Sequence, residues 1–107
     1  MTRRRLFQLV YAPLVKQHLE AIEPKYRPLI REAIEVQLQF EPDVEARNRK
    51  PLRRLVVLGA KWEIRFGPNN RFRVFYVVDR ENLQVQILAV GMKRRSQLII
   101  GGEEIEL

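Results

Sequence analysis

The stretch that decides the fold is AKWEIRFGPNNRFRVFYVVD, residues 60–79. In the first half of this stretch apolar and polar residues alternate, and in the second half every other residue is apolar from Phe72 on, which is the period of a strand with one buried face. The apolar residues that share a face are Trp62, Ile64 and Phe66 in the first half and Phe72, Val74, Tyr76 and Val78 in the second. The residues GPNN between the halves have the composition of a tight turn. The stretch therefore predicts an antiparallel hairpin whose apolar side faces a core.

The register of this hairpin follows from the same pattern, because a slip of one residue would turn every apolar side chain to the wrong face. Matching the two apolar sets places Phe66 opposite Phe72 and Arg65 opposite Arg73. The two arginines then share the face away from the core, and like charges directly opposite destabilise a strand pair. Three arrangements relieve the repulsion: an anion bound between the arginines, a bridge made by Glu63, or two solvated side chains that splay apart.

The elements on either side of the hairpin complete an α+β fold. Residues 5–11 read as a strand that stops before Pro13, and residues 83–90 read as an almost wholly apolar strand after a second turn at 79–82. Between residues 13 and 41 the apolar period becomes helical. The apolar stripes of two helices are Val15, His18, Leu19 and Ile22, and then Tyr26, Ile30, Ala33, Ile34 and Leu38. Pro24 ends the first helix, and Pro28 is tolerated only in the first turn of the second.

The predicted order is β-α-α-β-β-β: an antiparallel twisted sheet with an N-terminal helical hairpin packed on one face. Residues 41–58 are predicted to be a basic loop, either without regular structure or with a short strand at Leu55–Leu58. With 107 residues, of which 46% are hydrophobic, the chain has apolar material for one core, so residues 1–107 are predicted to form a single domain. Trp62 is predicted to lie in the core, and His18 is predicted to be a packing or boundary residue of the first helix. Phe75, on the same face as Arg73, either stacks an unpaired base or covers the sheet.

Composition excludes several classes of site. The chain has no cysteine and one histidine, which removes disulfides, thiol nucleophiles, cysteine metal sites and histidine-rich metal sites. We therefore expect neither a metal nor a cofactor. The apolar stretch near the N-terminus is too short for a signal peptide or a membrane span, so a cytoplasmic protein without a membrane partner is expected.

Charge divides the sequence into two layers. Residues 12–45 hold seven acids against four bases, whereas residues 47–73 hold nine lysines and arginines and a single acid, Glu63. The formal net charge is +7. Such a distribution favours an anionic partner, which is a nucleic acid, an acidic protein segment or an anionic membrane surface, over a merely solvated surface.

Four motifs in this order carry a family resemblance: RNRKPL at 47–52, WEIRFG at 62–67, FRVFY at 72–76 and VQILAVGMKRR at 85–95. Together with the preceding strand and helices they resemble the RelE/ParE superfamily of toxins from type II toxin–antitoxin systems, over nearly the whole chain. The resemblance implies a RelE-like fold and an acidic antitoxin as partner. RelE-like members cut messenger RNA in the ribosomal A site, and ParE-like members inhibit DNA gyrase.

The nuclease branch of the family supplies the candidate catalytic residues. The resemblance implies that Arg73 and Lys93 stabilise phosphate, and Arg65 joins Arg73 in that role. Lys93 is assigned to contact with the leaving group or the phosphate. Independently of the resemblance, Glu63 is the candidate base because it is the only carboxylate on its strand face, with a structural salt bridge to Arg65 or Lys61 as its alternative. The cationic residues predicted to contact RNA are Arg47, Arg49, Lys50, Arg53, Arg54, Lys61, Arg71, Arg94 and Arg95.

The sequence departs from the nuclease pattern at two places. No tyrosine occurs near Leu98–Ile100, where the pattern has one, and Glu63 stands where a second lysine is expected. The leading prediction is a toxin that acts as a metal-independent endoribonuclease, cuts mRNA on the ribosome and inhibits translation. The alternatives are a non-nuclease inhibitor of DNA gyrase and an inactive relative that only binds an antitoxin. The acids after the Gly101-Gly102 turn either dock on the basic cluster or form a tail without contacts.

Overall fold

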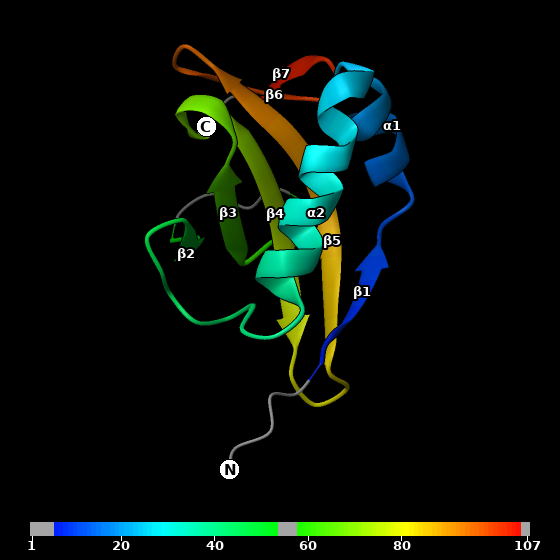
Figure 1. Ribbon diagram of the computed structural model, residues 1–107, viewed down its shortest axis with the longest axis vertical. Coiled ribbons are helices and arrows are strands. Elements are labelled where there is room, and N and C mark those ends of the chain that lie inside the picture. The colour runs from blue at the N-terminus through cyan, green and yellow to red at the C-terminus, as the bar shows by residue number, and fades with distance from the viewer. Residues whose placement is uncertain (1–5, 54–57, 106–107) are drawn as a thin grey trace.

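Two α-helices and seven strands form the part of the chain that the structure, a computed structural model, describes, which is residues 6–53 and 58–105 (Figure 1). In chain order they are β1 (Gln8–Tyr11), α1 (Leu14–Glu20), α2 (Arg27–Leu38), β2 (Arg49–Pro51), β3 (Trp62–Phe66), β4 (Phe72–Asp79), β5 (Gln84–Arg94), β6 (Gln97–Ile100) and β7 (Glu103–Ile105). Single turns of 3-10 helix, Pro24–Tyr26 and Pro68–Asn70, precede α2 and join β3 to β4. The predicted order and α+β class are confirmed, and β2, β6 and β7 are additional short strands.

The strands form one sheet in the order β2-β3-β4-β5-β6-β7, and all of these neighbours are antiparallel. β1 instead pairs with β5 in parallel, from Gln8 opposite Gln84 to Tyr11 opposite Ile87. Because β4 occupies one edge of β5, β1 and β6 share the other edge. β1 lies along the first half of β5, and β6 lies along its end at residues 91–94.

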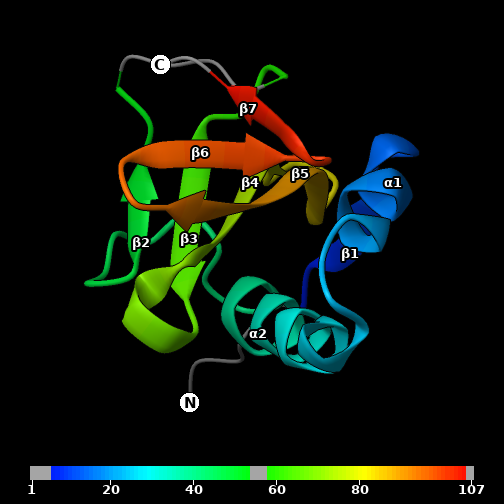
Figure 2. The same ribbon diagram turned by 90° about the horizontal axis from the view of Figure 1, so that it is seen from above.

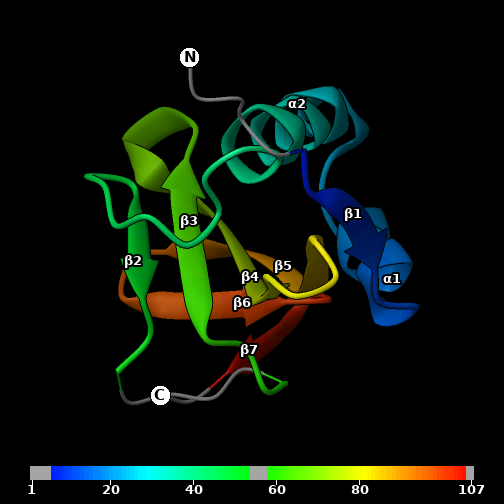
Figure 3. The same ribbon diagram turned by 90° about the horizontal axis from the view of Figure 1, so that it is seen from below.

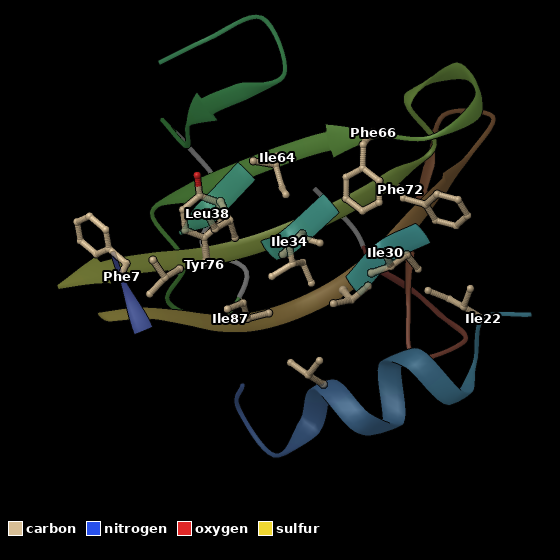
Figure 4. Close-up of a cluster of buried hydrophobic side chains, with 14 residues drawn as sticks. Phe7, Ile22, Ile30, Ile34, Leu38, Ile64, Phe66, Phe72, Tyr76 and Ile87 are labelled. Carbon is tan, nitrogen blue, oxygen red and sulfur yellow. The ribbon is translucent and has the colours of Figure 1, made fainter. Parts of the chain in front are cut away.

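The main core lies between the sheet and the two helices (Figure 4). The predicted stripe of α2 is confirmed, because Ile30, Ile34 and Leu38 are fully buried. They pack against sheet residues of the predicted apolar face, namely Ile64, Phe66, Phe72, Val74 and Tyr76. Trp62 packs partly buried against the same cluster, as predicted. His18 is buried on α1, where its Nδ1 accepts a hydrogen bond from the main-chain N–H of Val90 at 3.2 Å, so its packing role is also confirmed.

A second, smaller apolar cluster lies on the opposite side of the sheet. It consists of Ala60, Phe75, Ala89, Leu98 and Ile100, with Leu52, Leu88 and Ile105 packed against it. Viewed along the molecule, β6 and β7 lie on one side of β3 and β4 and α2 lies on the other (Figures 2 and 3). Phe75 is buried in this cluster, so it covers the sheet and is not exposed to stack a base. The face that carries Arg73 is therefore covered in part by the chain's own C-terminal strands.

Gly91 makes this second layer possible. A Cβ at this position would lie 2.6 Å from the carbonyl oxygen of Ile99 and 2.7 Å from Cγ1 of Ile100. Such distances are shorter than van der Waals contact, so only glycine lets β6 approach β5 this closely.

Three expectations differ from the structure. The last predicted strand ends not at residue 90 but at Arg94, so the basic segment after Gly91 is part of β5 and not a loop beyond it. The predicted loop 41–58 contains β2, and the C-terminal segment forms β6 and β7 around the Gly101-Gly102 turn. Of the optional strand at 55–58, residues 55–57 lie outside the described residues. The end of β5 pairs with β6, and β6 pairs with β7, through tight turns at residues 95–96 and 101–102, while β2 pairs with β3. Strands of three or four residues are too short to show the period of two by which a strand is predicted. No helix in the described ranges is long and apolar enough to cross a membrane.

Candidate nucleic-acid interface

The β3–β4 register sets two arginines against each other. Arg65 is the partner of Arg73, and Phe66 is the partner of Phe72, as the alternating pattern predicted. Side chains alternate along a strand, so both arginines lie on the side of the sheet opposite the α2 core. Glu63, two residues before Arg65, lies on the same side. We call the surface made by Glu63, Arg65, Arg73 and Lys93 the Arg73 face.

Glu63 bridges the two guanidinium groups. Its Oε1 accepts a hydrogen bond from Nε of Arg65 at 2.5 Å and a longer one from Nη1 of Arg73 at 3.5 Å. The Glu63 and Arg73 side chains are 9% and 11% exposed, whereas that of Arg65 is 45% exposed. Of the three arrangements that relieve the repulsion, the structure therefore has the carboxylate bridge. One negative charge faces two positive charges, which leaves the cluster cationic.

The β3–β4 turn fixes the orientation of Arg73. Its Nε donates to the carbonyl oxygen of Asn70 at 3.1 Å, which points the rest of the guanidinium toward Glu63. That carbonyl is available because Asn69 and Asn70 both adopt positive φ, at 55° and 51°. Asparagine tolerates the left-handed region better than other residues with a Cβ. The GPNN motif thus forms the predicted turn and also positions an arginine, a role that the sequence analysis did not assign to it.

Burial is the largest influence on Arg73. It lowers the pKa of the guanidinium, the Glu63 carboxylate raises this pKa, and the charge of Arg65 lowers it again. Arginine still remains protonated at any physiological pH. The site therefore holds a permanent, poorly hydrated positive charge, which attracts an anion more strongly than a fully solvated one.

Lys93 lies on the same face as Arg73. Arg73 pairs with Gly91 of β5, and Lys93 is two residues further along β5, so the two are diagonal neighbours. Lys93 also pairs with Leu98 of β6, and directly paired residues lie on the same face of a sheet. Leu98 belongs to the second apolar cluster, on the side of the sheet that carries Arg73, so this pairing places Lys93 on that side too. Diagonal neighbours lie within reach of long side chains. The register of β4 and β5 shifts between Phe75 and Tyr76, where Leu88 of β5 has no partner. This bulge determines which residues of β5 lie on the same side as Arg73.

The other predicted RNA contacts differ in their surroundings. Lys50 pairs with Glu63 across β2 and β3 and forms an ion pair with Glu45 at 3.5 Å. Exposed residues are Arg47, Arg53, Lys61, Arg94 and Arg95, the last two at the β5–β6 turn. Arg54 lies outside the described residues.

Two predicted contacts lie on the helix side and are not brought to the Arg73 face. Arg49 pairs with Ile64 and donates to the carbonyl oxygens of Val44 at 2.9 Å and Gln37 at 3.2 Å, near the end of α2. Arg71 lies 5.9 Å from the ring centroid of Tyr26 and the same distance from that of Phe72. Both side chains thus act within the fold, as a main-chain donor and as a cover for aromatic rings.

Other features lie away from the Arg73 face. A groove of about 960 Å³ runs between the end of β1, α1 and α2 and is lined by residues such as Tyr11, Leu19 and Arg31, with none of the four face residues among them. In residues 6–53 and 58–105, no cluster of three or more His, Asp or Glu side chains is suited to hold a metal ion. Glu103 and Glu104 belong to β7 and form no ion pair with any residue in those ranges, so they do not dock on the basic cluster.

Comparison with known proteins gives one informative result. No family model and no curated protein matches the chain. Among solved structures, the RelBE2 toxin–antitoxin complex from Mycobacterium tuberculosis matches with a TM-score of 0.68 and 25% sequence identity, over 87% of this chain and 98% of the matched chain. The fold is that of a RelE-like toxin. In this RelE-like chain the resemblance drawn from four sequence motifs is therefore confirmed at the level of the whole fold.

Proposed function

We propose that this RelE-like chain is the toxin of a toxin–antitoxin pair and acts as a metal-independent endoribonuclease that cuts messenger RNA on the ribosome, which inhibits translation. The observation that carries the proposal is the register that sets Arg65 opposite Arg73, with Lys93 as a diagonal neighbour on the same face. Three cationic groups from three strands suit a phosphate group of a nucleic-acid strand better than a small anion.

The chemistry needs no external nucleophile, because RNA carries one beside every phosphate. The 2′-oxygen attacks phosphorus, the bond from phosphorus to the 5′-oxygen breaks, and the products carry a 2′,3′-cyclic phosphate and a 5′-hydroxyl. The protein must accept the 2′-hydroxyl proton, stabilise the added charge on the phosphorane, and donate a proton to the departing 5′-oxygen.

The residues of the Arg73 face match these three tasks. Arg65 and Arg73 supply paired N–H donors for the non-bridging phosphate oxygens. Lys93 donates a proton, or a hydrogen bond, to the 5′-oxygen. Glu63 is the proton acceptor, but its Oε1 is bound to both guanidinium groups, so it can take a proton only after those contacts open. Exposed cations around the face, such as Lys61 and Arg94, then hold the flanking strand.

One observation favours the second candidate, a toxin without nuclease activity that inhibits DNA gyrase or only binds an antitoxin. Two side chains that could serve as a general acid or base are engaged elsewhere: Tyr76 donates to the carbonyl oxygen of Pro42, and His18 accepts from the main-chain N–H of Val90. Leu98 and Ile100, in the region where the nuclease pattern has a tyrosine, are buried apolar residues.

The proposed partner is an antitoxin protein. The matched structure is a toxin–antitoxin complex, and the net charge of +7 favours an acidic chain that folds upon binding. We further propose that the toxin acts in the cytoplasm, where both candidate targets are found.

The test compares the two targets with purified protein. A translation reaction is followed by mapping of message 5′ ends, and a parallel reaction measures DNA supercoiling by gyrase. We expect new message 5′ ends and unchanged supercoiling. Arg73→Ala is expected to reduce cleavage on the order of 10²-fold, because it removes a donor that stabilises developing charge. Arg65→Ala, at a half-exposed position, tests the same site with less risk to folding.

The matched control is Arg31→Ala, an exposed arginine of α2, which is expected to cut at the parent rate. Equal cleavage by the parent and by both Arg65→Ala and Arg73→Ala would rule out this site. Loss of supercoiling without new message ends would favour the gyrase inhibitor.

A further inference from the structure

The Glu63 carboxylate occupies the position that an anion between the two facing arginines would take. Its Oε1 receives the Nε–H of Arg65 and an Nη1–H of Arg73, the donors that a phosphate oxygen would use. We infer that Glu63 is an internal competitor for the phosphate of the ligand, so that phosphate binds the arginine pair only by displacing this carboxylate. The inference rests on the proposed function for the identity of the ligand as an RNA strand.

The two ion pairs differ in a way that makes displacement possible. Arg73 is nearly buried and anchored by the carbonyl oxygen of Asn70, so its position is fixed with or without ligand. Arg65 is 45% exposed, and Glu63 is its only side-chain partner among the described residues. Arg65 can therefore turn from the carboxylate toward solvent. The contact from Arg73 to Glu63, at 3.5 Å, lies at the limit of a hydrogen bond and is easily exchanged for a closer phosphate oxygen.

The carboxylate also has a structural purpose in the free protein. A buried guanidinium without a counter-ion strongly destabilises a fold, because the charge has lost its hydration and has gained no partner. Glu63 is the single acid among residues 47–73, and it stands beside the most buried arginine of the Arg73 face. Its presence in an otherwise cationic stretch is thus explained by Arg73, and the competition with phosphate is the consequence.

Competition of this kind selects for polyanions. A tethered carboxylate has a high effective concentration at the arginine pair, so a small anion that offers one contact is at a disadvantage. An RNA strand offers several contacts at once, to Lys93 and to exposed cations such as Lys61 and Arg94. Those outer contacts supply the binding free energy that opens the Glu63 bridge.

The test measures the binding of a short 2′-O-methyl oligoribonucleotide, whose blocked 2′-oxygen prevents cleavage, by fluorescence anisotropy. The variant Glu63→Gln keeps the shape of the side chain and removes its charge. The control Glu81→Gln changes an exposed residue of the β4–β5 turn. Like Glu63→Gln, it removes one negative charge and raises the net charge by one, from +7 to +8. We expect about tenfold tighter binding by Glu63→Gln, and less than about a twofold change for Glu81→Gln, since one hydrogen bond between charged groups is worth roughly a factor of ten or more.

Removal of the counter-ion is also expected to lower the melting temperature of Glu63→Gln, and the oligonucleotide is expected to raise it by more than it raises that of the parent. Should Glu63→Gln fail to fold, Glu63→Asp keeps the charge but withdraws it by one methylene, and it is again expected to bind more tightly. Binding by these variants no tighter than by Glu81→Gln would overturn the inference. Unchanged binding by Arg73→Ala would instead overturn the proposed function, so the two failures are separable.

Discussion

Arg73 shows how one residue acquires its properties from three neighbours. The turn carbonyl of Asn70 fixes its Nε, Glu63 takes one Nη, and burial by the surrounding sheet removes water from the rest. Once Glu63 is displaced, this planar, permanently charged side chain is still held by the Asn70 carbonyl and needs little reorganisation to bind phosphate. A lysine at the same position would have neither the fork of donors nor the fixed charge.

His18 provides a stability prediction at the residue scale. Its Nδ1 accepts the main-chain N–H of Val90, so it must be unprotonated there, and burial lowers its pKa from the ordinary value of 6.5. Below that value the unfolded chain binds a proton that the folded chain resists, and stability rises with pH wherever the unfolded state holds more protons. The free energy of unfolding is therefore expected to fall as pH decreases from about 7 to about 5.

Denaturant unfolding across this pH range measures the effect. The matched variant is His18→Asn, whose Oδ1 can accept the same hydrogen bond but does not titrate. We expect a flatter pH dependence for His18→Asn than for the parent. Identical slopes for the two proteins would show that His18 does not contribute.

At the scale of the element, β5 organises the sheet, and Gly91 is its critical position. The change Gly91→Ala places a methyl group 2.6 Å from the Ile99 carbonyl oxygen, so β6 must move away. Overpacking of this kind destabilises by roughly 1–3 kcal/mol. We expect that loss in the free energy of unfolding, measured in urea, together with weaker RNA binding, because Arg73 pairs with Gly91. The control is Ser96→Ala, a change at an exposed residue of the β5–β6 turn, which should leave both the free energy of unfolding and RNA binding unchanged. Equal stability of Gly91→Ala and the parent would contradict the close packing of β5 and β6.

The elements differ in how far the sequence predicts them. β3 alternates cleanly and β4 has one wholly apolar face, so their register and the Arg65–Arg73 pair follow from the pattern alone. β5 is apolar at nearly every position through residue 90, so its sequence does not show which residues lie on which face of the sheet. The bulge that leaves Leu88 unpaired determines which side chains lie on the same face as Arg73. β6 and β7, with four and three residues, depend on pairing with β5 and with each other. Arg49 reads as one more exposed cation, because the carbonyls that bind it come from distant residues.

At the scale of the whole molecule, the fold separates two charge layers. The acidic helical segment, residues 12–45, holds α1 and α2, and α2 lies on one side of the sheet while the Arg73 face lies on the other. A polyanion is thereby attracted to the sheet side and repelled from the helix side, which orients it before contact. The groove between β1, α1 and α2 lies with the helices and away from the Arg73 face, which leaves two separate surfaces on one small protein.

The most direct test of the central claim is to observe the two arginines while RNA binds. We would follow the side-chain Nε–H signals of the protein by NMR during titration with the 2′-O-methyl oligoribonucleotide. Arg27, whose Nε donates to the carbonyl oxygen of Leu19 at 2.9 Å on the helix side, serves as internal reference. The predicted result is that Arg65 and Arg73 shift together and saturate at the same RNA concentration while Arg27 stays unchanged. Saturable RNA binding that leaves the signals of both Arg65 and Arg73 unmoved would contradict the account.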